Sequence, residues 1–281
     1  MPELPEVETV RRGLAPAFEG RRIVRLDVNR PDLRFPFPDH FVERVTGARI
    51  ERLGRRAKFL AMDLSSGETL VMHLGMSGRF TVADEKLGKF HHDTGTLPAH
   101  DHVVFHLEDD VRVTYNDPRR FGFMEIWPTL SFETYPRLVD MGPEPLSNGF
   151  HADYLRAALA GKKTPIKAAL LDQSVVAGLG NIYVCEALFR AGISPRRLAS
   201  SIGPQRSARL AEQINAVIAE AIEAGGSSLR DFAAADGALG YFQHTFRVYD
   251  QEGEACPTCD SEVKRIVQSG RSSFYCGKCQ R

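Results

Sequence analysis

Residues 256–279 read CPTCDSEVKRIVQSGRSSFYCGKC, with one Cys-X-X-Cys pair at each end. The pairs, Cys256/Cys259 and Cys276/Cys279, are separated by 16 residues. This spacing is typical of a tetrahedral thiolate zinc site that joins two β-turns. Two disulfides or a redox pair are the alternatives, and the lack of a signal peptide and of a βαβ context disfavours them. We predict one structural Zn²⁺, because four thiolates leave no coordination position open for chemistry.

The composition indicates a globular protein of two or three domains. The chain has 281 residues, of which 43% are hydrophobic and 26% charged. No apolar run approaches the roughly 18 residues of a membrane span. The N-terminus also lacks the apolar region of a signal peptide. We therefore expect a cytoplasmic protein that does not contact a membrane.

The formal net charge is zero, but the basic residues are unevenly distributed. Six Arg or Lys residues lie between positions 44 and 58, and five between 264 and 281. Local basic patches can bind a polyanion even on a neutral protein. The alternative is an ordinary solvated surface, and charge alone does not separate the two.

Hydrophobic periodicity changes along the chain. Residues 5–15 have a helical pattern, and short alternating runs with turns between them follow, typical of an antiparallel sandwich or barrel. The runs are 22–28, 48–53, 57–64, 68–74, 102–107, 112–115 and 121–127. Residues 83–99 resemble a loop insertion. Five helical patterns come later, at 151–161, 164–173, 181–192, 203–225 and 228–235.

These patterns predict an α+β multidomain protein. We expect a β-rich domain with an N-terminal helix over 1–135, and a Pro- and Gly-rich linker over 136–150. A helical domain over 151–240 and the cysteine module over 241–281 complete the chain. The lone Cys185 lies on the apolar face of a predicted helix and is expected in the core.

Two short segments carry further information. Residues 178–181, Gly-Leu-Gly-Asn, join two predicted helices. They are either a plain turn with Asn181 as a cap, or a helix–turn–helix variant whose exposed N-terminus binds a phosphate. The other segment is the start, MPELPEVET, where Pro5, Glu6 and Glu8 suit the beginning of a helix. That reading leaves Pro2 and Glu3 unexplained.

Four motifs stand in order: MPELPEVE at the start, NDPRRFG at 116–122, GLGNIY at 178–183 and the paired cysteines. Over essentially the whole chain the sequence resembles the bacterial formamidopyrimidine-DNA glycosylase family. The resemblance implies an N-terminal antiparallel β-sandwich, a C-terminal helix–two-turns–helix domain and a β-hairpin zinc finger. It implies a monomer that excises 8-oxoguanine and formamidopyrimidines from double-stranded DNA of the nucleoid, and cleaves abasic sites by β,δ-elimination.

The resemblance also implies roles for particular residues. Pro2 is the expected nucleophile and Glu3 the acid at the glycosidic step, while Lys58 and Arg271 match the proton donors for β- and δ-elimination. Met76, Arg119 and Phe121 are similar to the residues that fill the gap left by the extruded base. The positions that match DNA contacts are His100, Arg119, Lys162, Lys167 and Asn181. The loop that caps the lesion is expected near Asp236–Gly240.

The chemistry of an N-terminal proline suits this role. An α-amine titrates near 8, so roughly a tenth to a quarter is unprotonated at neutral pH, against about 0.1% of an ordinary lysine. A secondary amine that attacks C1′ of a nucleotide gives a permanently cationic iminium, which acidifies the C2′ proton. Glu3 is close enough in sequence to transfer protons at the sugar. The amine exists only if Met1 is removed, which we therefore expect.

The sequence is also compatible with two other functions. The related endonuclease VIII branch of the superfamily removes oxidised pyrimidines. The motifs LPE, LGMSG and RRF resemble the formamidopyrimidine-DNA glycosylase branch more. A non-catalytic nucleic-acid-binding module would keep the zinc and the phosphate contacts but would not need Pro2 and Glu3. Met76 and Phe121 could also be core residues of strands, and Lys58 an ordinary edge-strand lysine.

Overall fold

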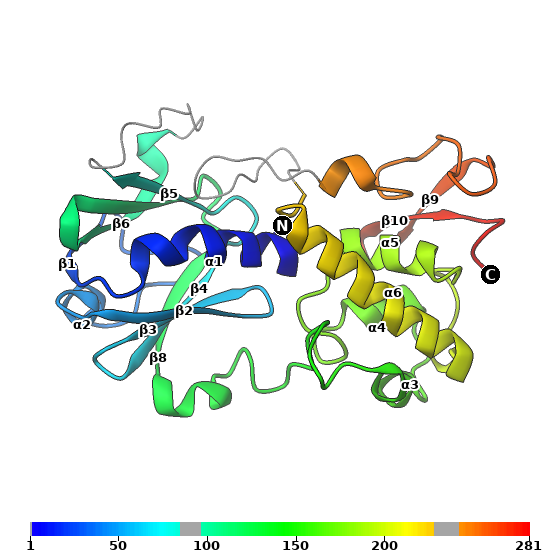
Figure 1. Cartoon of the computed structure of the whole chain (residues 1–281), viewed down its shortest axis with the longest axis horizontal. Helices are drawn as coiled ribbons and strands as arrows, with labels where there is room; N and C mark the ends of the chain where they lie inside the picture. The colour runs from blue at the N-terminus through cyan, green and yellow to red at the C-terminus, as the bar shows by residue number, and fades with distance from the viewer. Residues whose placement is uncertain (1, 85–96, 228–241) are drawn as a thin grey trace. The chain divides into compact units, whose positions relative to one another are not determined.

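The computed structural model describes residues 2–84, 97–227 and 242–281 (Figure 1). The chain divides into two compact units. One comprises Met1–Val139 and Gly225–Tyr241, and the other Asp140–Ala224 and Phe242–Arg281. This division differs from the expected domain limits, because the segment after Ala224 groups with the first unit and the cysteine module groups with the helices.

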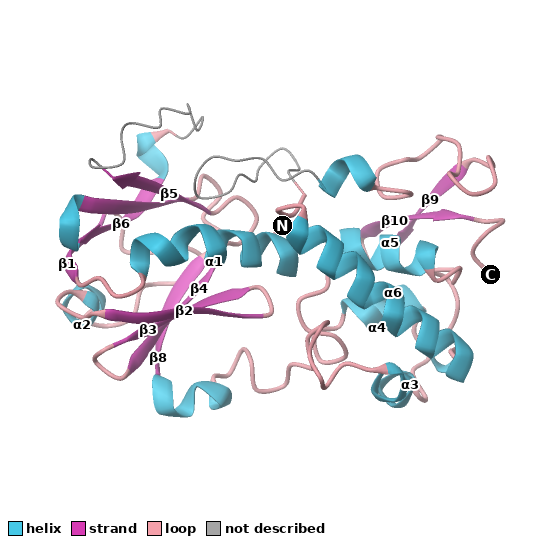
Figure 2. Cartoon of the chain, in the orientation of Figure 1, coloured by secondary structure: helices cyan, strands magenta, loops and turns pink. Residues whose placement is uncertain are grey.

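The first unit contains two four-stranded sheets (Figure 2). One has the order β1 (Ile23–Val28), β6 (Asp101–Leu107), β7 (Val111–Asn116), β5 (Arg79–Asp84). The other has the order β2 (Ile50–Arg56), β3 (Phe59–Leu64), β4 (Glu68–His73), β8 (Phe123–Pro128). Every pairing in both sheets is antiparallel. One buried core draws side chains from both sheets, among them Leu26, Phe105, Leu60 and Met72, which confirms the predicted sandwich.

One strand was not predicted from the sequence. β5 follows the Gly75–Gly78 turn, and its alternating run, RFTVAD, is short and ends at the acidic segment that we assigned to a loop over 83–99. Phe80 is 1% exposed and Val82 packs against the same core, so burial of these side chains adds to the pairing with β7 that holds the strand in the sheet. A 3₁₀ turn, Pro98–His100, precedes β6, and residues 85–96 of the expected insertion lie outside the described residues.

The helix predicted over 5–15 extends over Leu4–Phe18 as α1. Its buried residues Leu4, Val7, Val10, Leu14 and Phe18 recur every three or four positions, as an amphipathic helix requires. This face packs mainly on β2 and also on β3 and β5. A short helix α2 (Phe41–Val45) lies between β1 and β2, a 3₁₀ turn at Glu108–Asp110 connects β6 and β7, and another at Thr129–Thr134 follows β8.

The second unit contains four α-helices among its described residues. They are α3 (Ala152–Leu159), α4 (Ile166–Leu171), α5 (Asn181–Arg190) and α6 (Pro204–Glu223). Two 3₁₀ turns, Ala199–Ser201 and Phe242–Thr245, and the hairpin β9 (Val263–Gln268)–β10 (Arg271–Cys276) complete this unit. α5 is its centre, because it packs against α4, α6 and β10. The helix expected at 228–235 lies outside the described residues.

The helices and the hairpin share a hydrophobic core. Cys185 and Phe189 of α5 pack with Val263 of β9 and Phe274 of β10, so the prediction that Cys185 is a core residue is confirmed. Glu186, also on α5, is fully buried. Its carboxylate accepts hydrogen bonds from the backbone N–H groups of residues 247, 248 and 249, at 2.8–3.2 Å. α5 therefore anchors the segment that leads into the cysteine module.

Candidate functional site

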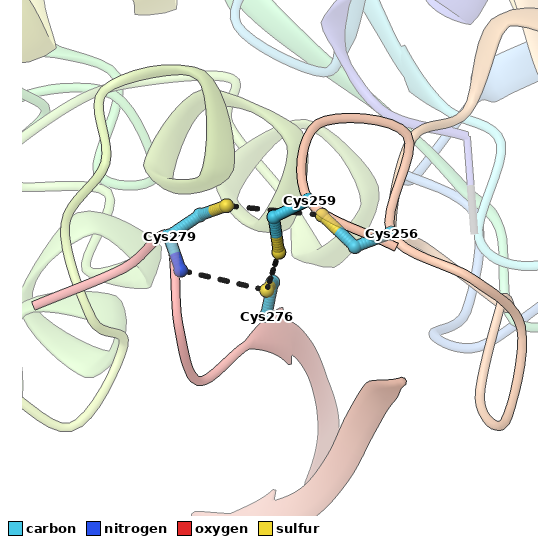
Figure 3. A group of neighbouring side chains, drawn as sticks. All are labelled: Cys256, Cys259, Cys276 and Cys279. Carbon is cyan, nitrogen blue, oxygen red and sulfur yellow. Dashed lines mark hydrogen bonds between the residues drawn. The ribbon is translucent and has the colours of Figure 1, made fainter. Parts of the chain in front are cut away.

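The four cysteines of the two pairs converge on one point (Figure 3). All four Sγ atoms lie within 4.8 Å of one another. The Sγ atoms of Cys256 and Cys279 are 3.9 Å apart, and those of Cys259 and Cys276 are 3.5 Å apart. Thiolates at about 2.3 Å from a tetrahedral zinc are about 3.8 Å apart, whereas disulfide-bonded sulfurs are about 2.0 Å apart. The donor set therefore fits one zinc ion and does not contain a disulfide.

At the start of β10, two residues expected to contact DNA, Lys167 and Asn181, meet the strand beside Arg271, the expected proton donor for δ-elimination. The backbone carbonyl of Ser272 accepts hydrogen bonds from Nζ of Lys167 at 2.6 Å and from Nδ2 of Asn181 at 3.0 Å. Arg271, the preceding residue, is exposed and lines an open hollow of about 610 Å³ together with Asn181 and Arg265. Asn181 opens α5, so the helix N-terminus also faces this region.

Lys167 is not placed as the sequence suggested. Its side chain is 1% exposed, and Nζ also donates to Oγ of Ser273 at 2.6 Å. A residue that lies on the inner face of α4 and ties this helix to β10 does not offer its charge to solvent. We therefore assign Lys167 to the support of Arg271 and Asn181 rather than to a phosphate contact.

Lys162 is placed differently. Its side chain is 36% exposed, and Nζ lies 3.9 Å from Oδ2 of Asp172. Ion pairs this long and this exposed are weak, so Lys162 is free to exchange the carboxylate for an external anion.

In the first unit, two loops carry the residues predicted to form a wedge. Met76 is half-buried in the loop between β4 and β5, and Arg119 and Phe121 are exposed in the loop between β7 and β8. The guanidinium of Arg119 lies 4.8 Å from the ring centre of Phe121. The exposed fraction of Phe121 is 43%, so neither Phe121 nor Met76 is an ordinary core residue.

The N-terminal residues are buried in the same unit. Glu3 is the N-cap of α1 and forms a capping box with Glu6, whose Oε2 accepts the backbone N–H of Glu3 at 2.8 Å. Oε1 of Glu6 accepts from the backbone N–H and the hydroxyl of Ser227, at 2.8 and 2.9 Å. Pro2 is buried directly before this cap. The capping box therefore fixes the backbone of the expected acid, Glu3, next to the buried Pro2.

Lys58 lies in the turn between β2 and β3, where Ala57 adopts a left-handed conformation with φ 51°. It is 8% exposed, so it is not an ordinary edge-strand lysine. Its neighbour Phe59 pairs in register with His73 on β4. Burial, followed by the positive charges of Lys58, Arg34 and Arg137, lowers the pKa of His73 to about 4. His73 is consequently neutral at physiological pH, and its Nδ1 accepts the backbone N–H of Gly75 at 3.0 Å.

Comparison with known protein families gives matches to three family models along the chain. The family model for the formamidopyrimidine-DNA glycosylase N-terminal domain matches residues 1–124, and that for the formamidopyrimidine-DNA glycosylase H2TH domain matches 141–233. A zinc finger found in FPG and IleRS matches residues 253–281. The chain belongs to the formamidopyrimidine-DNA glycosylase family. The resemblance seen in the sequence is thereby confirmed, as are the fold class and the zinc-binding module.

The relatives of this glycosylase-family chain are similar over their full length. It is 63% identical to the formamidopyrimidine-DNA glycosylase of Ruegeria pomeroyi and 57% identical to that of Rhodopseudomonas palustris, covering 100% of both chains in each case. The solved MutM (FPG) protein of Thermus thermophilus is 39% identical with a TM-score of 0.86, covering 99% of this chain and 98% of that one. Lactococcus lactis Fpg in complex with DNA containing an abasic site is 32% identical with a TM-score of 0.88, covering 99% of each chain.

Sequence reasoning missed three residues that support these sites: His73, Asp117 and Glu186. Asp117 and Glu186 are fully buried and His73 is partly buried. Their partners are backbone groups or hydroxyls, of which Ser77 and residues 247–249 are distant in sequence. Two signals were available: Asp117 lies in the NDPRRFG motif, and Glu186 is an acidic residue inside the apolar run NIYVCEALF. No helix in the described part of the chain is long and apolar enough to cross a membrane.

Proposed function

We propose that this protein is a DNA glycosylase and abasic-site lyase that excises oxidised purines, including 8-oxoguanine and formamidopyrimidines, from double-stranded DNA. The observation that carries the proposal is full-length identity of 57–63% to formamidopyrimidine-DNA glycosylases. Structural neighbours support it, because they are complexes of Lactococcus lactis Fpg with DNA that contains an abasic site or N7-benzyl-Fapy-dG. We place the enzyme in the bacterial cytoplasm, where it works on nucleoid DNA as a monomer.

In the proposed reaction, Pro2 attacks C1′ of the damaged nucleotide with its free secondary amine. The glycosidic bond breaks, the base leaves with the bonding electrons, and the amine loses its proton. Glu3 then protonates O4′ as the C1′–O4′ bond opens, which leaves an iminium between Pro2 and C1′. Because this nitrogen is an amide while Met1 is attached, we propose that Met1 is removed before the enzyme works.

The iminium withdraws electrons from C2′, so the C2′ proton becomes acidic. Its loss expels the 3′ phosphate by β-elimination, and a second elimination expels the 5′ phosphate. Lys58 is the proposed proton donor in the first elimination and Arg271 in the second. The low exposure of Lys58 suits a proton donor, because few water molecules compete with it.

DNA binding is proposed to use both units. Asn181, Arg271 and Lys162 of the second unit contact phosphates, and the bound zinc supports the hairpin that presents Arg271. His100 and Arg119 of the first unit contact the strands. Met76, Arg119 and Phe121 fill the gap left when the damaged base is extruded, which offsets part of the few kcal/mol that unstacking costs.

The decisive experiment is borohydride trapping on a duplex that contains 8-oxoguanine. Mass spectrometry after proteolysis should place the deoxyribose adduct on a peptide that begins at Pro2. Pro2→Gly should retain some trapping through its primary amine, and Glu3→Gln should strongly reduce excision. Protein that retains Met1 should bind the duplex but neither excise nor trap.

Two results would contradict the proposal: an adduct on Lys58, or full activity with Met1 in place. The substrate class is tested separately with thymine glycol as a competing lesion. Faster excision of thymine glycol than of 8-oxoguanine would assign the chain to oxidised pyrimidines instead. DNA binding without any trapped adduct would indicate a non-catalytic binding protein.

A further inference from the structure

Asp117 is a fully buried carboxylate at the base of the two loops that carry Met76, Arg119 and Phe121. Its Oδ1 accepts a hydrogen bond from the hydroxyl of Ser77 at 2.6 Å, in the first loop. Its Oδ2 accepts from the backbone N–H of Gly122 at 2.8 Å, in the second loop, and from the hydroxyl of Tyr115 at 3.2 Å. The side chain therefore connects both loops through one charged group.

The loops are also in direct contact around this carboxylate. A Cβ added to Gly75 would lie 2.3 Å from the backbone carbon of Phe121 and 2.4 Å from the nitrogen of Gly122. A Cβ added to Gly122 would lie 1.9 Å from the hydroxyl of Tyr115 and 3.1 Å from Oδ2 of Asp117. Only glycine allows this approach, so the two loops behave as one packed body.

The backbone of Asp117 connects a third segment. Its N–H donates to the carbonyl of His100 at 3.1 Å, and its carbonyl accepts from Nε2 of His102 at 2.9 Å. The same carbonyl accepts the N–H of Arg120, which closes a turn in which Arg120 has φ 53°. Asp117 thus contacts every segment of the first unit that carries a proposed wedge residue, and also His100.

We propose that Asp117 is a positioning residue that locks the two loops together, so that Met76, Arg119 and Phe121 enter the DNA as one preformed wedge. This inference rests on the wedge role given to these three residues under the proposed function. An unlocked wedge would have to order two loops during insertion, and that ordering would cost conformational entropy and slow the insertion. Asp117 is expected to act on the rate of insertion and not on the chemistry at Pro2.

A carboxylate suits this position better than a neutral side chain. It accepts hydrogen bonds and donates none, and here three donors converge on it from three directions. Burial of a charged group is costly unless such donors satisfy it, so the carboxylate disfavours any arrangement in which either loop moves away. Ser77 extends the lock, because its Oγ also accepts the backbone N–H of Arg119 at 3.2 Å.

The test follows wedge insertion directly. A duplex carries a tetrahydrofuran abasic analogue, with 2-aminopurine opposite it as a fluorescent reporter of unstacking, and binding is followed by stopped flow. Asp117→Ala should slow the fluorescence rise by about tenfold or more, as expected for loss of a coupled network. Asp117→Asn should remain within about threefold of wild type, because its oxygen can still accept from Gly122 and Tyr115 while the hydroxyl of Ser77 accepts from its amide.

Three comparisons make the result specific. Asp63 is a buried carboxylate of the same unit that accepts from Thr69 and Arg52, so Asp63→Asn is the matched control and should leave the fluorescence rise unchanged. Borohydride trapping on a single-stranded abasic site, which needs no wedge, should be unaffected by Asp117→Asn and Asp117→Ala. Adding Arg119→Ala to Asp117→Ala should slow insertion by no more than about twofold further, because both changes remove the same event.

Each contrary result identifies what fails. A wild-type insertion rate in Asp117→Ala would overturn the positioning role. Equal slowing of insertion in Asp117→Asn and Asp117→Ala would overturn it as well. If Asp117→Ala does not fold, Ser77→Ala replaces it, and a wild-type rate in that variant would overturn the role as well. If the wild-type protein shows no fluorescence rise, and Arg119→Ala changes nothing, then the wedge itself is wrong.

Discussion

The substitution Lys167→Met distinguishes between two roles of Lys167: a buried residue that supports β10, and a residue that contacts a DNA phosphate. Methionine has a similar length and no charge, so it removes both hydrogen bonds of Nζ, to Ser272 and to Ser273, while it fills most of the space. The two acceptors keep partners, because Nδ2 of Asn181 still donates to the Ser272 carbonyl and Ser273 still donates to Gln268. The Ser272 carbonyl therefore keeps a donor, and the Ser273 hydroxyl keeps one hydrogen bond in which it is the donor.

The size of the effect follows from these contacts. Two net hydrogen bonds at about 1 kcal/mol each, with no orphaned partner, give a loss of about 2 kcal/mol in the free energy of unfolding. The start of β10 then keeps its pairing with β9 and the hydrogen bond from Asn181 but loses its connection to α4, so Arg271 becomes less well placed. We expect DNA affinity to fall by about tenfold, which corresponds to about 1.4 kcal/mol.

The assay is the dependence of log Kd on log salt concentration, measured beside urea unfolding. A residue that contacts a phosphate lowers the magnitude of this slope by about one when it is replaced. Lys167→Met should leave the slope unchanged while it reduces stability, because Arg271 keeps its charge. A slope that falls by one, with the stability of the wild type, would refute the buried-support assignment and restore the direct contact.

The remaining predictions concern zinc, acid stability and Lys162. Cys256→Ser or Cys279→Ser should release zinc, measured by metal analysis, and should sharply weaken DNA binding while the first unit stays folded; active protein without zinc would contradict this. Burial alone would raise the pKa of Glu8, but hydrogen bonds from Arg11 and Arg12 lower it from 4.5 to about 2. Its stabilisation is therefore present above pH 4.5 and lost as the pH falls toward 2, so Glu8→Gln should cost about 1–2 kcal/mol at pH 7, after discounting for the exposed Arg12, and nothing near pH 2. If the free energy of urea unfolding differs between the wild type and Glu8→Gln by the same amount from pH 7 to pH 2, the predicted role of the Glu8 charge is wrong. Lys162→Ala should lower the salt slope by about one without changing stability, and an unchanged slope would remove Lys162 from the interface.

Local patterns in the sequence were enough for most of the fold. Periods of two and 3.6 residues predicted seven of the eight strands of the sandwich and the helices α1, α3, α4, α5 and α6. These periods arise because one face of a strand or helix is buried. They can therefore be recognised without knowing which other element packs against that face. β5 escaped because it is a short run next to an acidic segment, and its place depends on pairing with β7.

Whole motifs likewise identified the family and the zinc module. The two-residue spacing within each cysteine pair is a local property of the sequence, and it lets both thiolates of a pair bind the same metal ion. The metal then sets the distances between the four thiolates. Pro2 and Glu3 stood out because an ordinary helix start left them unexplained. Their roles at the site remain proposals, as do those of Lys58 and Arg271.

Only the tertiary structure distinguished residues of the same type. Lys162 and Lys167 differ by five positions in the sequence, yet one is partly exposed and the other is enclosed against β10. The sequence by itself determined which chemical groups are present and which local elements carry them. The tertiary structure decided which of those groups face solvent and which are buried and hydrogen-bonded inside the protein, as Lys167 and Asp117 are. This depends on hydrogen bonds between segments that come together only when the chain folds, and no local pattern encodes such long-range pairing.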